Sequence, residues 1–181
     1  MPETLPPMHY VCTHAEAREL IGARDRFWVS NCGCREGRGS CARSRMDVCL
    51  MFVESDRGSG SGWHAVTRGD VDAILLEAGT RRLVARPIPD ASRAATTGIC
   101  FCCDDCCGYF LNAEEICDPG RFTEQTDLAA CTHCGDCVEV CHFDARRMRD
   151  ERLAVTPANC YGCGLCADVC PPVCIVMTPR G

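Results

Sequence analysis

Two segments in the first half of the chain place apolar side chains at helical spacing, each directly behind a capping box. The first capping box is Thr13-x-x-Glu16, the second is Thr67-x-x-Asp70, and Gly79 is expected to end the second helix. The apolar positions on the two helix faces are Ala17, Leu20 and Ile21, and then Val71, Ile74, Leu75 and Ala78. The pattern therefore predicts two amphipathic helices, each with a defined N-terminus.

Short apolar runs follow both helices and predict strands at residues 27–29 and 83–85. After each strand the chain reaches a C-x-C pair, first Cys32-Gly33-Cys34 and later Cys100-Phe101-Cys102. This order indicates either an internal symmetry or a coincidence between two short amphipathic helices, and the sequence leaves both open. The GSGSG stretch at residues 58–62 is typical of a linker loop.

Composition adds one dominant feature, because 20 of the 181 residues are cysteine. The hydrophobic share of 46% and the charged share of 24% are typical of a folded soluble protein. So many cysteines occur in disulfide-rich secreted domains or in metal-binding intracellular ones. Residues 1–12 have neither the basic start nor the apolar core of a signal peptide, and no apolar run is long enough to span a membrane. We therefore expect a cytoplasmic protein with reduced cysteines and no membrane span.

The charged residues narrow the choice of partners. All 19 basic residues are arginine, against 25 acidic residues, and the net charge is -6 before any metal-bound thiolate is counted. Nucleic acid is thus a poor partner, whereas a basic patch on another protein is a better one. The absence of lysine excludes Schiff-base chemistry and a P-loop, and no Gly-rich dinucleotide motif or Ser-His-Asp set is recognisable.

The cysteines fall into three blocks, and only Cys12 and Cys117 stand alone. The first block consists of Cys32, Cys34, Cys41 and Cys49, and the second of Cys100, Cys102, Cys103, Cys106 and Cys107. The third block is a duplication, in which CTHCGDCVEVCHFDARRM from Cys131 aligns with CYGCGLCADVCPPVCIVM from Cys160. Each half has the spacing C-x2-C-x2-C-x3-C, which can wrap three corners of a cubane. Zinc, the alternative, needs no third C-x2 step, so the spacing favours iron and sulfur.

The third block resembles bacterial two-cluster [4Fe-4S] ferredoxins over about 50 residues. The resemblance implies ferredoxin-like α+β packing and an exchange of the last cysteine between the two runs. Short helices are expected at 135–140 and 164–169, with short strands at 153–155 and 175–177. The implied ligands of cluster I are Cys131, Cys134, Cys137 and Cys170, and those of cluster II are Cys160, Cys163, Cys166 and Cys141.

Two residues depart from the ferredoxin pattern. His142 stands where the first run would have proline, and it either donates a hydrogen bond near a cluster sulfur or simply faces water. Cys174 lies opposite Ala145 in the repeat, where we expect a buried, inert thiol.

The first two cysteine blocks resemble those of iron-sulfur proteins of anaerobes in which such blocks precede a ferredoxin module. We hypothesise that their nine cysteines, Cys32, Cys34, Cys41, Cys49, Cys100, Cys102, Cys103, Cys106 and Cys107, hold two further [4Fe-4S] clusters, making four in total. Most ligands of one cluster would come from residues 32–49 and most of the other from 100–107. Because consecutive side chains of an extended segment point to opposite sides, Cys102 and Cys103 should mark a boundary between the two sites. Zinc and a non-cubane cluster are the alternatives.

The 35–45 loop next to these cysteines is basic, since it contains Arg35, Arg38, Arg43 and Arg45. These side chains could donate to cluster sulfurs and raise a reduction potential. Alternatively they form a docking face, or they are only solvated.

Together these features predict an α+β protein with three parts. Residues 1–98 form a helix and strand domain with the 32–49 cysteines, residues 99–130 a Cys-rich segment that completes the N-terminal metal sites and serves as a linker, and residues 131–181 the ferredoxin domain. The predicted function is relay of single low-potential electrons, as a multicluster ferredoxin or as a non-catalytic electron-transfer subunit of an anaerobic oxidoreductase complex. Expected partners are a flavoprotein or reductase subunit within a complex, or a second copy of the chain. The alternatives are an iron-sulfur enzyme subunit whose N-terminal cluster binds substrate, and a redox or iron sensor.

Overall fold

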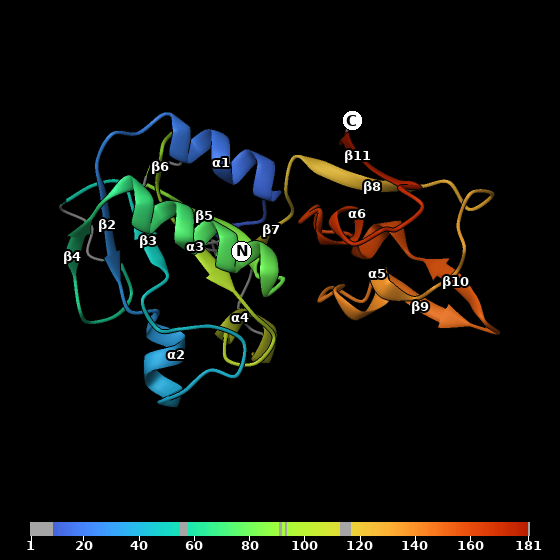
Figure 1. Ribbon diagram of the computed structural model, residues 1–181, viewed down its shortest axis with the longest axis horizontal. Coiled ribbons are helices and arrows are strands. Elements are labelled where there is room, and N and C mark those ends of the chain that lie inside the picture. The colour runs from blue at the N-terminus through green and yellow to red at the C-terminus, as the bar shows by residue number, and fades with distance from the viewer. Residues whose placement is uncertain (1–8, 55–57, 91, 93, 113–116, 181) are drawn as a thin grey trace, which may run out of the picture.

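The computed structural model describes residues 9–54, 58–90, 92, 94–112 and 117–180, which form an N-terminal and a C-terminal region side by side (Figure 1). The expectation that the chain has no leader sequence rests mainly on residues 1–8, which lie outside the described residues. Within the described ranges, no helix combines the length and apolar character needed to cross a bilayer.

An antiparallel sheet of five strands organises the N-terminal region, with the order β4-β2-β3-β6-β5. The strands are β2 (Phe27–Ser30), β3 (Cys49–Met51), β4 (His64–Val66), β5 (Val84–Pro89) and β6 (Thr96–Cys102). The predicted strand 27–29 is confirmed within β2, and the predicted strand 83–85 begins one residue before β5. The long connection through α3 returns the chain to the sheet edge next to β6.

Helices α1 (His14–Gly22) and α3 (Arg68–Thr80) cover one face of this sheet (Figure 1). Both predicted capping boxes are present, because the Thr13 and Thr67 hydroxyls accept hydrogen bonds from backbone N–H groups three residues further on. Helix α3 continues past Gly79 to Thr80, since the N–H of Arg81 still bonds to the Glu77 carbonyl. The predicted end of the helix is therefore one residue early.

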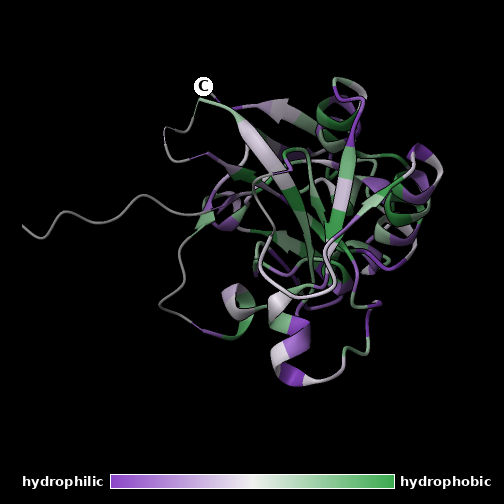
Figure 2. Cartoon of the chain, turned by 90° about the vertical axis from the view of Figure 1, so that its left-hand side faces the viewer, coloured by the Kyte–Doolittle hydropathy of each residue, from purple (hydrophilic) through white to green (hydrophobic). Residues whose placement is uncertain are grey.

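The alternation of side chains along the strands separates the two faces of the sheet. Leu50, Ile99 and Phe101 face the helices in the main apolar core, whereas Cys49 and Cys100 pack on the opposite side with Trp28 and Met51. In Figure 2 the central strands are coloured largely as hydrophobic, and helix α2 at the bottom largely as hydrophilic. The pleat thereby sends neighbouring residues of β6 to different surroundings.

The order of a capped helix followed by a strand occurs twice, as predicted, but the two C-x-C pairs have different surroundings. Cys32 is the residue before α2 (Gly33–Arg38) and Cys34 lies in that helix, whereas Cys100 and Cys102 lie within strand β6. The linker prediction for residues 58–62 is wrong, because Ser59 and Ser61 are hydrogen-bonded to the start of α2 and to Glu36. A Cβ atom at Gly60 would come within 2.2 Å of the Asn31 carbonyl oxygen, so only glycine allows this approach.

The C-terminal region has the expected short helices and the two expected strands, at 153–155 and 175–177, and each strand pairs with one that was not predicted. Strand β8 (Phe122–Thr126) pairs with β11 (Ile175–Pro179), and β9 (Arg146–Arg149) pairs with β10 (Arg152–Val155), both antiparallel. Helices α5 (Asp136–Glu139) and α6 (Leu165–Asp168) are related by the repeat, and a 3-10 turn η1 lies at Pro157–Asn159. Both helices begin after a glycine at positive φ, Gly135 at 90° and Gly164 at 79°, where a side chain would be strained.

Short elements join the two regions. Strand β1 (His9–Tyr10) pairs in parallel with β7 (Cys117–Asp118), and helix α4 (Gly108–Leu111) follows the second cysteine block. Aromatic rings from both sides meet in one cluster: Tyr109, Phe110, Phe143 and Tyr161. Strand β8 precedes residue 131, so the C-terminal sheet draws on residues upstream of the predicted domain boundary.

Candidate metal centres

The first cavity of the C-terminal region is lined by the thiols of one cysteine run and by the last cysteine of the other. These thiols belong to Cys131, Cys134, Cys137 and Cys170. Helix α5 carries Cys137, and apolar side chains of Leu153 and Ile175 complete the wall. The four residues implied for cluster I therefore meet at one place.

A second cavity has the same construction with the runs exchanged. Its thiols belong to Cys141, Cys160, Cys163 and Cys166, and its other walls include the stacked rings of Phe143 and Tyr161. Burial raises the pKa of Cys163 to about 12 and that of Cys166 to about 11, so these sulfurs become thiolates only when a metal compensates the charge. Glu124 also lines this cavity, but its carboxylate is paired with Arg146. The four thiols are a donor set that fits a [4Fe-4S] cluster.

A buried arginine lies between the two cavities. Arg146 is 2% exposed and donates to the sulfur of Cys137 over 3.4 Å, to the Thr126 hydroxyl over 2.8 Å and to the buried Glu124 carboxylate. The attraction of Cys166 contributes to the raised pKa of Arg146, after the opposing effect of burial. The guanidinium therefore lies near ligands of both predicted clusters and is held there by an acidic partner.

The two departures from the ferredoxin pattern have defined surroundings. The side chain of His142 is only 10% exposed, packs on Phe110 and lies 3.4 Å from the Arg82 carbonyl oxygen, so the solvated interpretation is wrong. Its contacts run to the N-terminal region. Cys174 is buried as expected, yet it lies in the wall of the first cavity with its sulfur 3.5 Å from that of Cys170.

In the N-terminal region, a cavity of about 640 Å³ is lined by thiols of both blocks. It is lined by His9, Arg35 and Arg86 and by seven cysteines: Cys32, Cys34, Cys100, Cys102, Cys103, Cys106 and Cys107. Arg86, in β5, is 3% exposed and donates to the sulfurs of Cys117, Cys107 and Cys102 at 3.3, 3.4 and 3.6 Å. We call this group of side chains the Arg86 cavity.

The charge of the Arg86 cavity is set by its arginine and by hydrogen bonds between thiols. The pKa of Cys34 is lowered to about 2, chiefly because the thiols of Cys107 and Cys32 donate to it, and Arg86 adds to the effect. The pKa of His9 falls to about 4 because of burial and the nearby guanidinium. At one side of the cavity, the Cys100 sulfur lies 3.6 Å from His9 Nε2 and 3.9 Å from the Cys49 sulfur. The pKa of Cys102 is also lowered, whereas the pKa values of Cys32, Cys100 and Cys107 are raised, so the cavity favours thiolate at only some of its sulfurs.

Cys103 and Cys106, at the wall of the Arg86 cavity, form a much tighter group with Cys41. The Cys103 sulfur lies 3.6 Å from that of Cys41 and 3.3 Å from that of Cys106, and all three lie within 4.8 Å of one another. The structure thus groups the thiols differently from the two blocks, because Cys41 joins Cys103 and Cys106 rather than Cys32 and Cys34. The Cys102 and Cys103 sulfurs contact different groups, as expected, but both residues line the Arg86 cavity.

The arginines of the 35–45 loop have different roles. Arg35 is fully buried and donates to the Cys103 sulfur over 3.8 Å and to the Phe101 carbonyl over 2.9 Å, so it is neither solvated nor part of a docking face. Arg38, Arg43 and Arg45 are exposed, and the last two form ion pairs with Asp104 and Asp47. Only the innermost arginine therefore reaches a thiol of this group.

Sequence reasoning missed three residues of these sites. Arg86 and Arg146 lie in strands, and no motif marks them; a charged residue in the short run Val84–Pro89 was the only available signal. Cys117, which stands alone in the sequence, contacts Arg86 because β7 brings it beside β1. Cys12 is different: it lies in the apolar core, where burial raises its pKa strongly.

Comparison with known proteins assigns the C-terminal region. Residues 130–174 match the family model of the 4Fe-4S dicluster domain, and this part of the chain is a domain of that ferredoxin type. The chain is 28% identical to Ferredoxin-3 of Nostoc sp. over 78 residues, which cover 33% of this chain and 80% of that ferredoxin.

Two further relatives are longer proteins. One is Hydrogenase-4 component A of Escherichia coli, 42% identical over 48 residues that cover 25% of this chain and 23% of the relative. The other is the methylamine utilization ferredoxin-type protein MauM of Paracoccus denitrificans, 38% identical over 72 residues that cover 34% and 32%. This chain thus spans less than a third of the length of either. Together the comparisons support iron-sulfur electron transfer as the general function.

Proposed function

We propose that this protein carries single electrons between redox proteins, as a multicluster ferredoxin or as the electron-transfer subunit of a larger oxidoreductase. The observation that carries the proposal is the exchange of one cysteine between the two thiol-lined cavities of the dicluster domain. Bound there, [4Fe-4S] clusters would supply reversible one-electron chemistry. Cys131, Cys134, Cys137 and Cys170 would hold the first, and Cys141, Cys160, Cys163 and Cys166 the second.

The side chains around the two sites have distinct tasks in this proposal. Phe143 and Tyr161 exclude water from the second site, whereas the exposed Cys134 leaves the first site closer to the surface. Arg146 donates to Cys137 and stabilises negative charge on the ligand sulfur. The more exposed first site is therefore the exchange point for a partner, and the second lies toward the N-terminal region.

We propose a further iron-sulfur cluster in the Arg86 cavity. Its volume of about 640 Å³, its thiols from several elements and its buried cation support this assignment. Three hydrogen bonds from Arg86 to sulfur would compensate thiolate charge where water is excluded. The total of four clusters remains a prediction.

The partner is proposed to be a redox protein in a complex. One relative is named as a hydrogenase component, and the net charge of -6 favours a basic surface on the partner. We propose a flavoprotein or reductase subunit in a reducing compartment as this partner.

Electron paramagnetic resonance of the anaerobic, dithionite-reduced protein tests the carrier function. We expect signals from two interacting clusters in the dicluster domain, and reoxidation by a one-electron acceptor without any substrate. Cys134→Ser should change the first cluster and leave the second intact, with the exposed Arg38→Gln as a control. Absence of iron from the folded, anaerobically prepared protein would overturn the proposal.

A second candidate function is supported by the size of the Arg86 cavity. Seven cysteines, a histidine and two arginines line it, and the five thiols left without Cys103 and Cys106 are still more than one cubane requires. A cluster with an open iron there could bind a small anionic substrate beside Arg86. Titration of candidate substrates into the reduced protein separates the two functions, since a pure carrier gives no change in its cluster spectrum.

A further inference from the structure

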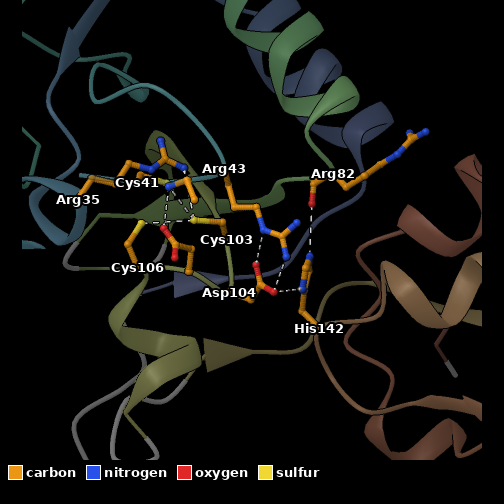
Figure 3. Close-up of polar contacts among 10 residues, drawn as sticks. Arg35, Cys41, Arg43, Arg82, Cys103, Asp104, Cys106 and His142 are labelled. Carbon is orange, nitrogen blue, oxygen red and sulfur yellow. Dashed lines mark hydrogen bonds and ion pairs between the residues drawn. The ribbon is translucent and has the colours of Figure 1, made fainter.

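The group formed by Cys41, Cys103 and Cys106 has the dimensions of a site for one metal ion. A metal bound by tetrahedral thiolates at about 2.3 Å holds its sulfur atoms about 3.8 Å apart. The observed sulfur separations of 3.6 and 3.3 Å are close to that value. Figure 3 shows the three side chains converging on one point from the 41–45 loop and the 100–107 segment.

The dicluster domain provides an internal comparison for this spacing. All eight of its ligand cysteines belong to the described residues, and none of them forms a group of three ligand atoms within 4.8 Å. This difference has a physical reason, because a cubane places each thiolate on a different iron and so keeps the sulfurs apart. The tight group is therefore unlike the sites that fit a [4Fe-4S] cluster in the same chain.

The local sequence explains how the three thiols meet. Cys103 and Cys106 form a C-x2-C turn directly after β6, and the pleat sends Cys103 to the helix side of the sheet, away from Cys102. The 41–45 loop is fixed over this turn, since the backbone N–H of Ala42 donates to Asp105 over 2.8 Å and Arg43 binds Asp104 through two hydrogen bonds. Two loops distant in the sequence thus present a preformed set of sulfur ligands.

Hydrogen bonds prepare the Cys41 sulfur for metal binding. The backbone N–H groups of Arg43 and Ser44 donate to this sulfur. Such N–H donors stabilise a thiolate in the same way that they stabilise a metal-bound sulfur.

Arg35 balances the charge that metal binding would leave at the three thiols. Three thiolates and a divalent cation leave one negative charge, which is costly away from water. Arg35 is fully buried, and its hydrogen-bond acceptors are the Arg45 and Phe101 carbonyls and the Cys103 sulfur. One buried guanidinium beside one net negative charge makes the site neutral, with no carboxylate among these acceptors.

We propose that Cys41, Cys103 and Cys106 bind a single divalent, sulfur-preferring metal ion of the zinc class, distinct from the iron-sulfur clusters. No other ligand atom of the described residues belongs to this group, so water or another small ligand takes the fourth position. The ion joins the 41–45 loop to the turn after β6. The proposal does not depend on electron transfer, because it concerns thiols outside the dicluster domain.

Metal analysis of the full chain, purified anaerobically from cells supplied with iron and zinc, is the first test. We expect about one zinc per chain in addition to iron, and zinc K-edge absorption should show three sulfur neighbours and one lighter atom at the metal. A folded protein whose iron content is about 16 per chain with no stoichiometric zinc would overturn the proposal.

Two variants test the ligands without relying on the wild-type protein alone. Cys41→Ser and Cys106→Ser should each lower zinc occupancy at least about tenfold while the dicluster spectrum stays unchanged. Cys12→Ala, which removes a buried thiol outside the site, is the matched control and should keep its zinc. If Cys106→Ser fails to fold, the half-exposed Cys41→Ser still decides the matter, and full zinc retention in that variant contradicts the assignment. Loss of zinc with intact electron transfer would separate this site from the proposed function.

Discussion

The two regions of this protein collect their thiols in opposite ways. In the C-terminal region, each cavity takes three cysteines from one short run and a fourth from its repeat, so the ligand sets follow the order of the sequence. In the N-terminal region, the Arg86 cavity and its contacts combine thiols from Cys32 to Cys117, and the compact group joins Cys41 to Cys103. A metal site can therefore be read from spacing only where its ligands are local.

The regions also differ in how they compensate buried charge. Each has an arginine next to sulfur, but Arg146 is held by the Glu124 carboxylate, whereas the hydrogen bonds of Arg86 go to cysteine sulfurs. In the C-terminal region, the Glu124 carboxylate is therefore the negative partner of the buried arginine. In the N-terminal region, thiolates must supply the negative charge next to Arg86. The stability of this region therefore depends on whether its cysteine sulfurs are charged.

The largest effect is expected from removing the cation of the Arg86 cavity. In Arg86→Met we expect loss of the N-terminal cluster, about 4 Fe per chain, and a fall of about 3–5 kcal/mol in the free energy of unfolding, because several thiolates lose their buried partner. Iron analysis and anaerobic urea unfolding measure the two quantities. The exposed Arg38→Met is the control. An unchanged iron content in Arg86→Met would contradict the proposed difference in charge compensation between the two regions.

A smaller effect is expected at the arginine that has its own carboxylate. Arg146→Met should lower the free energy of unfolding by about 3 kcal/mol because Glu124 is left buried without its cation, and it should lower the potential of the first cluster because Cys137 loses a donor. Potentiometric titration and urea unfolding check both results. Adding Glu124→Gln should restore much of the stability but not the potential. If the double variant regains both, the donor role of Arg146 is wrong.

The smallest effect is expected at the extra thiol of the dicluster domain. Cys174→Ala should keep both clusters and lower the stability by about 1 kcal/mol or less, because a sulfur is lost from a packed wall without loss of a ligand. Cys170→Ala, only 3.5 Å away, should lose or alter the first cluster. Visible absorption and iron content distinguish the two variants, and equal loss from both would give Cys174 a ligand role.

The amphipathic helices, their capping boxes and the dicluster motif could be predicted because each depends on residues close together in the chain. The 3.6-residue period and the Thr-x-x-acid signals are local, as is a turn that repeats cysteine at every third position. The family match at residues 130–174 covers this same local motif.

The grouping of the N-terminal thiols could not be predicted in the same way. Alternation along β6 correctly indicated that Cys102 and Cys103 diverge, but it contains no information about which distant loop each side chain meets. The order of strands in the sheet decided that Arg86 lies opposite Cys100, and packing of the loops decided that Arg35 reaches Cys103. The sequence alone determined that this chain has the sulfur ligands and helices of an iron-sulfur protein, since those patterns are short-range. Only the tertiary structure decided which sulfurs share a site and which arginine balances them, because burial and strand pairing bring together residues that no spacing rule connects.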